Sequence, residues 1–160
     1  MATPSHELLL PGVLGRHEFG KTILVVEDDP FVRSAACELL RELGFEILEA
    51  QNSAAARHIF FFDHARVDLV VCDAVLPDGC GIELCRHLQR GNNAPRVILT
   101  SGYPLDTKAL SRNSEAHFLK KPYSGDSLIK TLHKILGTEC ASGEVLPPRS
   151  MADGLQNVTG

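Results

Sequence analysis

Polar side chains that could do chemistry together follow four short apolar runs of this chain. They are Glu27, Asp28 and Asp29 after the first run, then Asp73, Thr100 and Lys121 after three later ones. Carboxylates that lie close together repel one another unless a cation joins them, and hard oxygen ligands suit Mg²⁺. A fixed ammonium beside an acidic cluster can hold an anion. If the fold gathers these side chains, their types predict a site for a metal ion and an anionic group.

Each of these side chains also has a simpler interpretation. Asp28 or Asp29 can cap a helix that begins just after it. Lys121 can be a solvated surface charge, and Thr100 can be a strand residue with its hydroxyl turned to the backbone. Three consecutive acids nevertheless exceed what one cap needs. Because Lys121 precedes Pro122, its backbone is held extended, which restricts where its ammonium can point.

The segment that must position these residues alternates short apolar runs with stretches of helical period. Strands are expected at 23–26, 46–48, 69–72, 97–99 and 117–119. Helices are expected between Pro30 and Gly44 and at 53–62, 82–90 and 124–136, with a weaker one at 106–113. Three of the strands are continuous apolar runs, as in a parallel sheet covered by helices on both faces. The alternation predicts a right-handed α/β fold around a parallel sheet.

The first helix has the clearest pattern, because one face of it is apolar and both ends carry stop signals. Asp29 can cap it, Pro30 suits its first turn, and Gly44 can end it. In open α/β sheets the functional crevice lies beyond the carboxyl ends of the strands. The acids, the hydroxyl and the ammonium are therefore expected at one edge of the sheet.

Composition excludes several other classes of protein. The 160 residues carry 44% apolar and 22% charged side chains, as expected for one globular domain. The net charge of −4 argues against direct binding of nucleic acid. No apolar run approaches the roughly 20 residues that a membrane span needs, so no membrane insertion and a cytoplasmic location are expected.

The ends of the chain and its cysteines add little chemistry. Residues 1–20 and 138–160 lack a sustained period and are rich in Gly, Pro and Ser, so a flexible leader and a flexible tail are expected around a domain at 21–137. The five cysteines are spread along the chain without a CxxC pair. Free thiols are therefore expected, rather than a disulfide framework or a zinc site.

Five ordered motifs give the segment a family resemblance. They are ILVVEDDP, DLVVCDAVLPDGCG, VILTSGY, the aromatic Phe118 and LKKPY. Over about residues 21–137 the chain resembles the receiver domains of bacterial two-component response regulators, the CheY-like domains. The resemblance implies a flavodoxin-like (βα)5 fold, with a doubly wound, parallel, five-stranded sheet in the strand order 2-1-3-4-5.

The resemblance also implies roles for the acidic residues. Asp73 would be the phosphoacceptor, and Glu27 and Asp28 would be the acidic pair that holds Mg²⁺ together with Asp73. Val75 would lend a backbone carbonyl to the same ion.

The remaining roles concern the phosphoryl group and the switch that responds to it. By the same resemblance, Thr100 and Lys121 would contact the phosphoryl oxygens. Thr100 and Phe118 would form the switch, in which the aromatic ring swings inward after phosphorylation.

These roles together imply a signalling module rather than an enzyme. The chain would be a Mg²⁺-dependent phosphoacceptor in a His-Asp phosphorelay, with a histidine kinase or a histidine phosphotransfer protein as donor. It would signal through protein contacts, as a monomer or weak dimer. The sequence does not indicate the downstream partner.

Three other interpretations stay open. The TSGY motif after the fourth strand resembles receivers that are attached to hybrid histidine kinases, so the chain could be a fragment of such a kinase. A hydrolase of the phosphoaspartate kind needs an Asp-x-Asp pair after the first strand, where this chain has Glu27-Asp28-Asp29. A degenerate receiver that only binds partners does not need the complete set of Asp73, Thr100 and Lys121.

Overall fold

A five-stranded parallel sheet forms the centre of the molecule. The computed structural model describes residues 20–62, 66–105 and 116–137. The strands are β1 (Thr22–Val26), β2 (Glu46–Ala50), β3 (Leu69–Asp73), β6 (Arg96–Ser101) and β7 (Ala116–Lys120). Their order is β2-β1-β3-β6-β7, and every neighbouring pair is parallel. Taken in chain order, these strands have the predicted arrangement 2-1-3-4-5.

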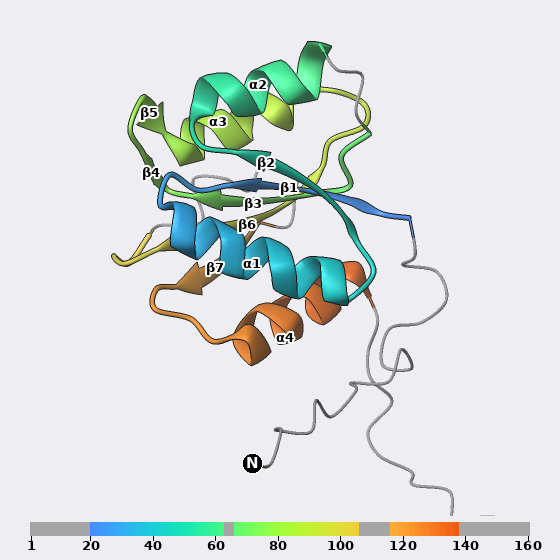
Figure 1. Cartoon of the computed structure of the whole chain (residues 1–160). Coiled ribbons are helices and arrows are strands. Elements are labelled where there is room, and N and C mark those ends of the chain that lie inside the picture. Colours follow the sequence, from blue (N-terminus) through green and yellow to red (C-terminus); the bar gives the residue numbers. More distant parts are fainter. Residues whose placement is uncertain (1–19, 63–65, 106–115, 138–160) are drawn as a thin grey trace, which may run out of the picture.

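Helices cover both faces of the sheet. They are α1 (Pro30–Glu42), α2 (Ser53–Phe62), α3 (Gly81–Leu88) and α4 (Gly125–Leu136). Figure 1 shows α2 and α3 on one face of the sheet and α1 and α4 on the other. The predicted helices are confirmed, although α3 begins one residue earlier and ends two residues earlier than expected. The helix expected at 106–113, the leader and the tail lie outside the described residues.

The first helix begins and ends as its sequence predicts. The Oδ1 atom of Asp29 accepts hydrogen bonds from the backbone N–H groups of Phe31 (2.8 Å) and Val32 (3.1 Å). Pro30 occupies the first turn, and Gly44 lies just beyond the helix with a φ of 91°. Asp29 is thus the cap of α1, and Glu27 and Asp28 remain available to bind a metal ion.

Two apolar clusters lie on opposite faces of the sheet and fix its strands in place. Leu24 and Val70 pack in the cluster under α2 and α3. Ile23 and Val71, which point the other way, pack in the cluster under α1 and α4. Full burial of one such side chain stabilises a fold by about 1.5–3 kcal/mol. Because both faces are covered, the strands read as continuous apolar runs rather than as alternating ones.

A short hairpin follows β3 directly. Its strands are β4 (Val75–Leu76) and β5 (Gly79–Cys80), which pair antiparallel. This second, two-stranded sheet is not among the elements that the sequence predicts. The hairpin leads directly into α3, so its position sets how the first turn of α3 meets the end of β3.

The cysteines and the helix lengths agree with the composition. Cys37, Cys72, Cys80 and Cys85 are free thiols, as predicted, while Cys140 lies outside the described residues. Within the parts of the chain that the structure describes, no helix has the length and apolar character needed to cross a membrane.

Gly81, the first residue of α3, lies close to the end of β3, and we expect Gly81→Ala to be destabilising. A methyl group there would lie 1.9 Å from the carbonyl oxygen of Asp73 and 3.0 Å from the Cys72 sulfur. Relieving that overlap requires a backbone shift, which costs about 1–3 kcal/mol. Urea unfolding of Gly81→Ala should show this loss.

Gly91→Ala is the matched control for this substitution, because nothing lies within 4 Å of the methyl group that it adds. It should leave the free energy of unfolding nearly unchanged. Equal stability of the two variants would contradict the close approach at Gly81.

Candidate functional site

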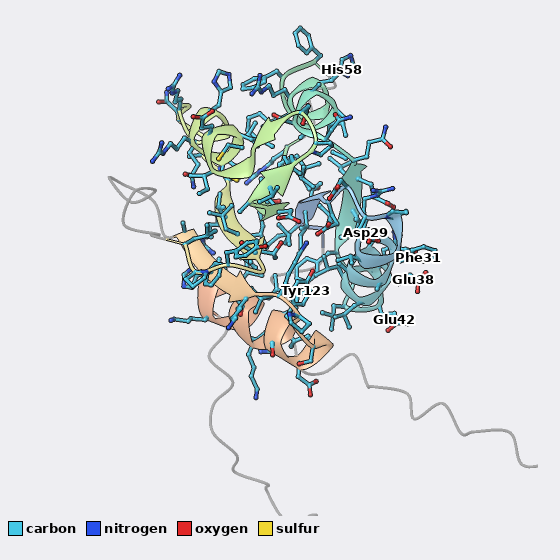
Figure 2. The ribbon with its side chains drawn as sticks, turned by 90° about the vertical axis from the view of Figure 1, so that its left-hand side faces the viewer. Asp29, Phe31, Glu38, Glu42, His58 and Tyr123 are labelled. Atoms are coloured by element: carbon cyan, nitrogen blue, oxygen red, sulfur yellow. The ribbon has the colours of Figure 1, made fainter. Side chains whose placement is uncertain are left out.

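The residues predicted to do chemistry meet at one end of the sheet. Glu27 follows β1, Asp73 is the last residue of β3, and Lys121 follows β7. Thr100 lies directly opposite Asp73 in the register of β3 with β6. Figure 2 is turned so that this end of the molecule faces the viewer. The expectation that these side chains share one edge of the sheet is therefore confirmed.

A single ammonium joins two of the carboxylates. The Nζ atom of Lys121 donates to Oε2 of Glu27 at 2.6 Å and to Oδ2 of Asp73 at 2.5 Å. All three side chains are largely buried, with exposed fractions of 23% for Lys121, 5% for Glu27 and 11% for Asp73. The backbone N–H of Lys121 donates to the carbonyl oxygen of Ser101, which fixes where the side chain starts. Lys121 is thus a fixed cation in the site and not a solvated surface charge.

Burial and pairing shift the pKa values of this group of charges in a consistent way. Burial raises the pKa of Glu27, and the hydrogen bond and charge of Lys121 only partly oppose that effect. Burial by itself would lower the pKa of Lys121, but its hydrogen bonds to Asp73 and Glu27 outweigh this and raise it. The ammonium therefore stays charged, while Glu27 gains a proton more readily than an exposed glutamate does.

The carboxylates present a donor set that fits a hard divalent cation. One oxygen from each of Glu27, Asp28 and Asp73 can be chosen so that all lie within 4.8 Å of one another. Asp28 is exposed and Glu27 is buried, so the set opens toward solvent on one side. The carboxylates outnumber the one ammonium, and Mg²⁺ would balance the excess charge with the oxygen ligands that it prefers.

Val75, in the hairpin, contacts the Asp73 carboxylate through its backbone. Its backbone N–H donates to Oδ1 of Asp73 at 2.9 Å. Both oxygens of Asp73 thus have a donor, Val75 for Oδ1 and Lys121 for Oδ2. The use of the Val75 carbonyl as a metal ligand stays a prediction.

The two predicted switch residues lie on β6 and β7, and Thr100 is next to Asp73 in the register of the sheet. Thr100 is buried, and its hydroxyl lies 3.5 Å from the carbonyl oxygen of Cys72, a long hydrogen bond to the neighbouring strand. This is the backbone contact of the simpler interpretation. Phe118 is half-buried and packs against the apolar cluster under α2 and α3. Their roles in switching stay predictions.

Arg33 is a site residue that the sequence analysis missed. Its Nη1 atom donates to the carbonyl oxygen of Glu27 at 2.7 Å and lies 3.4 Å from that of Asp28. Its Nε atom lies 3.5 Å from a carboxylate oxygen of Glu49 on β2. Arg33 therefore holds the backbone of the acidic pair. A basic residue five to six positions after the acidic pair is a signal for this contact, but nothing local in the sequence points to Glu49.

Comparison with known proteins gives a match over most of the described chain. The family model for the response regulator receiver domain matches residues 23–133. The phosphate regulon transcriptional regulatory protein PhoB of Pseudomonas aeruginosa is 35% identical over 121 residues, which are 73% of this chain and 52% of that protein. The sensor kinase CckA of Brucella abortus is 33% identical over 117 residues, 72% of this chain and 12% of that kinase. The chain thus spans about half of one relative and a small part of the other.

Solved structures agree with this match. The receiver domain of the hybrid histidine kinase CckA superposes with a TM-score of 0.62 at 30% identity, covering 72% of this chain and 98% of that one. The receiver domain of the sensor histidine kinase PA1611 from Pseudomonas aeruginosa, at 24% identity and a TM-score of 0.63, has the same fold over 74% of this chain and 98% of its own. That structure has a magnesium ion in its active-site cleft.

The raised pKa of Glu27 predicts how Mg²⁺ binding depends on pH. A metal ligand must be ionised, so protonation of Glu27 competes with the ion. Because the pKa of Glu27 is raised, binding should weaken as the pH falls, and the weakening should begin at a higher pH than at a site whose glutamate has its ordinary pKa. In calorimetric unfolding, Mg²⁺ at about one hundred times its Kd should stabilise the protein by about 2.7 kcal/mol at pH 7.5. At pH 5.5 the same concentration should stabilise it less.

Glu27→Gln serves as the control for this dependence. It removes both the titrating group and one ligand, so Mg²⁺ should bind it more weakly, with little change in affinity between the two pH values. Equal stabilisation of the unchanged protein by Mg²⁺ at pH 5.5 and 7.5 would contradict the assignment of Glu27 as a ligand with a raised pKa.

Proposed function

We infer that this chain, which belongs to the response regulator receiver domain family, takes a phosphoryl group from a phosphohistidine onto Asp73. Receiver domains are phosphoacceptor signalling domains rather than enzymes with an external substrate. The observation that carries the proposal is the pairing of Asp73 with Lys121 inside a cluster of carboxylates that fits Mg²⁺. The family alone would not distinguish an active receiver from a degenerate one, whereas this cluster is what the chemistry needs.

The transfer is a displacement at phosphorus. A carboxylate oxygen of Asp73 forms a bond to phosphorus, and the bond from phosphorus to the imidazole nitrogen of the donor breaks with its electron pair going to the imidazole. Mg²⁺, when bound by Glu27, Asp28 and Asp73, would supply positive charge for the equatorial phosphoryl oxygens. Lys121 supplies a second positive charge next to Asp73, and its raised pKa keeps it protonated throughout.

The same geometry supports a switch that follows the chemistry. Phosphorylation adds roughly one to two negative charges and three strong acceptor oxygens. The Thr100 hydroxyl has only a 3.5 Å contact to give up, so a rotation about its side-chain bond toward the phosphoryl group costs little. That rotation would leave space beside Thr100, into which the ring of Phe118 would move from the neighbouring strand.

An apolar groove beside the site supports a protein as the phosphoryl donor. It has a volume of about 480 Å³ and lies between α1 and the start of α4, with Lys121 at its edge. Its other lining residues include Val32, Ala35, Leu39, Pro122 and Tyr123. Phe31 is not among the lining residues, but it is 85% exposed on the same helix, and Figure 2 shows it pointing outward from α1. Receiver domains interact with histidine kinases or phosphotransfer proteins, and we place the donor's histidine-bearing surface over this groove.

The comparisons support two arrangements of the whole protein. The chain matches about half of PhoB, part of the sensor kinase CckA and the solved receiver domain of the hybrid histidine kinase CckA, and its TSGY motif resembles receivers of hybrid kinases. We propose residues 21–137 as one receiver domain with a cytoplasmic location and no direct nucleic-acid contact. That domain acts either as a separate regulator or within a hybrid histidine kinase.

Incubation with acetyl phosphate tests the phosphoacceptor. Intact-mass analysis with and without Mg²⁺ should detect one added phosphoryl group that is stable to acid and labile to base, and only when Mg²⁺ is present. Asp73→Asn keeps the shape of the side chain and should show no adduct with an unchanged far-UV circular dichroism spectrum. An unimpaired Asp73→Asn variant would overturn the site. No adduct on the unchanged protein would favour a degenerate binding module.

Phe31→Ser tests the docking surface separately from the chemistry. Removing an exposed aromatic anchor from an interface costs about 1–2 kcal/mol, so transfer from the phosphorylated donor protein should slow by about tenfold at low concentration. Uptake from acetyl phosphate should not change, because Phe31 does not contact Asp73.

Phe62→Ser is the matched control for Phe31→Ser. Phe62 is also strongly exposed, at 70%, but lies on α2 at the opposite face of the sheet. It should accept phosphoryl groups from the donor protein at the normal rate. An equal loss in both variants would remove the donor from the groove beside α1.

A further inference from the structure

The hairpin after β3 is bonded to a helix that lies far from it in sequence. The two carboxylate oxygens of Asp78, at the turn between β4 and β5, accept hydrogen bonds from two backbone N–H groups of α2. Oδ1 accepts from Ser53 and Oδ2 accepts from Ala54, each at 2.8 Å. Figure 1 shows the hairpin beside the first turn of α2. One side chain thus joins the segment that follows Asp73 to a separate element.

The first turn of α2 depends on this contact for its free N–H groups. The first N–H groups of any helix have no partner within the helix. Asn52 satisfies one of them, because its side-chain oxygen accepts from Ala55 at 2.8 Å. Asp78 satisfies two others, and the first turn of α2 contains no acidic residue of its own. A carboxylate here also interacts favourably with the positive end of the helix dipole.

The Asp78 carboxylate is well suited to hold this position. Its hydrogen bonds from Ser53 and Ala54 lower its pKa, even though the group is exposed. It therefore stays ionised over the pH range in which the site works. The contact is also geometrically specific, because one planar carboxylate spans two successive N–H groups and so fixes both the place and the orientation of the turn.

The hairpin that Asp78 holds is part of the phosphoacceptor site. Leu76 pairs with Gly79 next to the turn, and Val75 pairs with Cys80. Val75 in turn donates its N–H to Oδ1 of Asp73. A displacement of the turn would therefore be passed through one antiparallel pair to the donor that orients the Asp73 carboxylate.

We propose that Asp78 is a positioning residue for the phosphoacceptor site. It fixes the β4–β5 hairpin against the amino end of α2, so that Val75 and Asp73 are held in the geometry that binds Mg²⁺ and accepts the phosphoryl group. Asp78 touches neither the ion nor the phosphoryl group. The inference rests on the proposed function, because it assigns to Asp78 a role in that same site.

The test compares Asp78→Ala with Asn52→Ala. Both remove hydrogen-bond acceptors from the first turn of α2, but only Asp78 is attached to the hairpin. Mg²⁺ affinity is measured by isothermal titration calorimetry on the full chain, and phosphoryl uptake from acetyl phosphate is followed by intact mass. Asp78→Ala should weaken Mg²⁺ binding by about tenfold, as loss of a supporting contact behind a metal ligand does. It should also slow uptake.

Asp78→Ala and Asn52→Ala should lower the thermal midpoint of unfolding by similar amounts, because each removes a cap of α2. Asn52→Ala should nevertheless keep its Mg²⁺ affinity within about twofold of that of the unchanged protein. Asp78→Asn keeps one acceptor oxygen for the two N–H groups and should give an intermediate Mg²⁺ affinity. This graded recovery is not expected if Asp78 contributes only to overall stability.

Two results would overturn the inference. One is an Asp78→Ala variant whose Mg²⁺ affinity and uptake rate equal those of the unchanged protein. The other is an equal loss of Mg²⁺ affinity in Asp78→Ala and Asn52→Ala, which would assign the effect to α2 rather than to the hairpin. Failure of the proposed function itself looks different, because the unchanged protein would then take up no phosphoryl group.

Discussion

The contact between the Lys121 ammonium and the carboxylates of Glu27 and Asp73 is the constraint on which the rest of the structure depends. Burial of like charges is costly, and a buried ion pair stabilises a fold only when its geometry is good and its remaining polar atoms are satisfied. Here the three groups come from the ends of β1, β3 and β7, which are distant in sequence. The cost of gathering them is offset by the two apolar clusters that hold the sheet together. The site is thus a costly cluster of charges at the end of a well-packed sheet.

That concentration of charge explains why the site can respond to ligands. A receiver must have two states of similar free energy, and a ligand shifts them only through its different affinity for each. In the present state Lys121 donates hydrogen bonds to both Glu27 and Asp73. The Thr100 hydroxyl makes a long contact with the backbone, and Phe118 packs against the core. A metal ion and a phosphoryl group would each change the charge that Lys121 must balance. Few strong bonds have to break for the side chains to rearrange.

The segments that carry the acids are each held by contacts to other elements of the fold. Arg33 binds the backbone of the acidic pair and is tied to β2 through Glu49. On the other side of the site, Gly81 allows α3 to approach the Asp73 backbone, and Asp78 attaches the hairpin to α2. These contacts connect the segments that carry the acids to α1, α2, α3 and β2.

The sequence by itself determined the parts of this protein that depend on short-range rules. Apolar runs and helical periods gave the strands and helices, the Asp29 cap of α1 was readable from its neighbours, and the motifs identified the site residues, because each of these signals lies within a few positions along the chain. Only the tertiary structure decided that Lys121 joins Glu27 to Asp73 and that the Thr100 hydroxyl contacts the backbone of β3. It alone connected Arg33 to Glu49 and Asp78 to α2. Those contacts join residues on different elements, and their distances depend on strand register and helix packing, which no local pattern encodes.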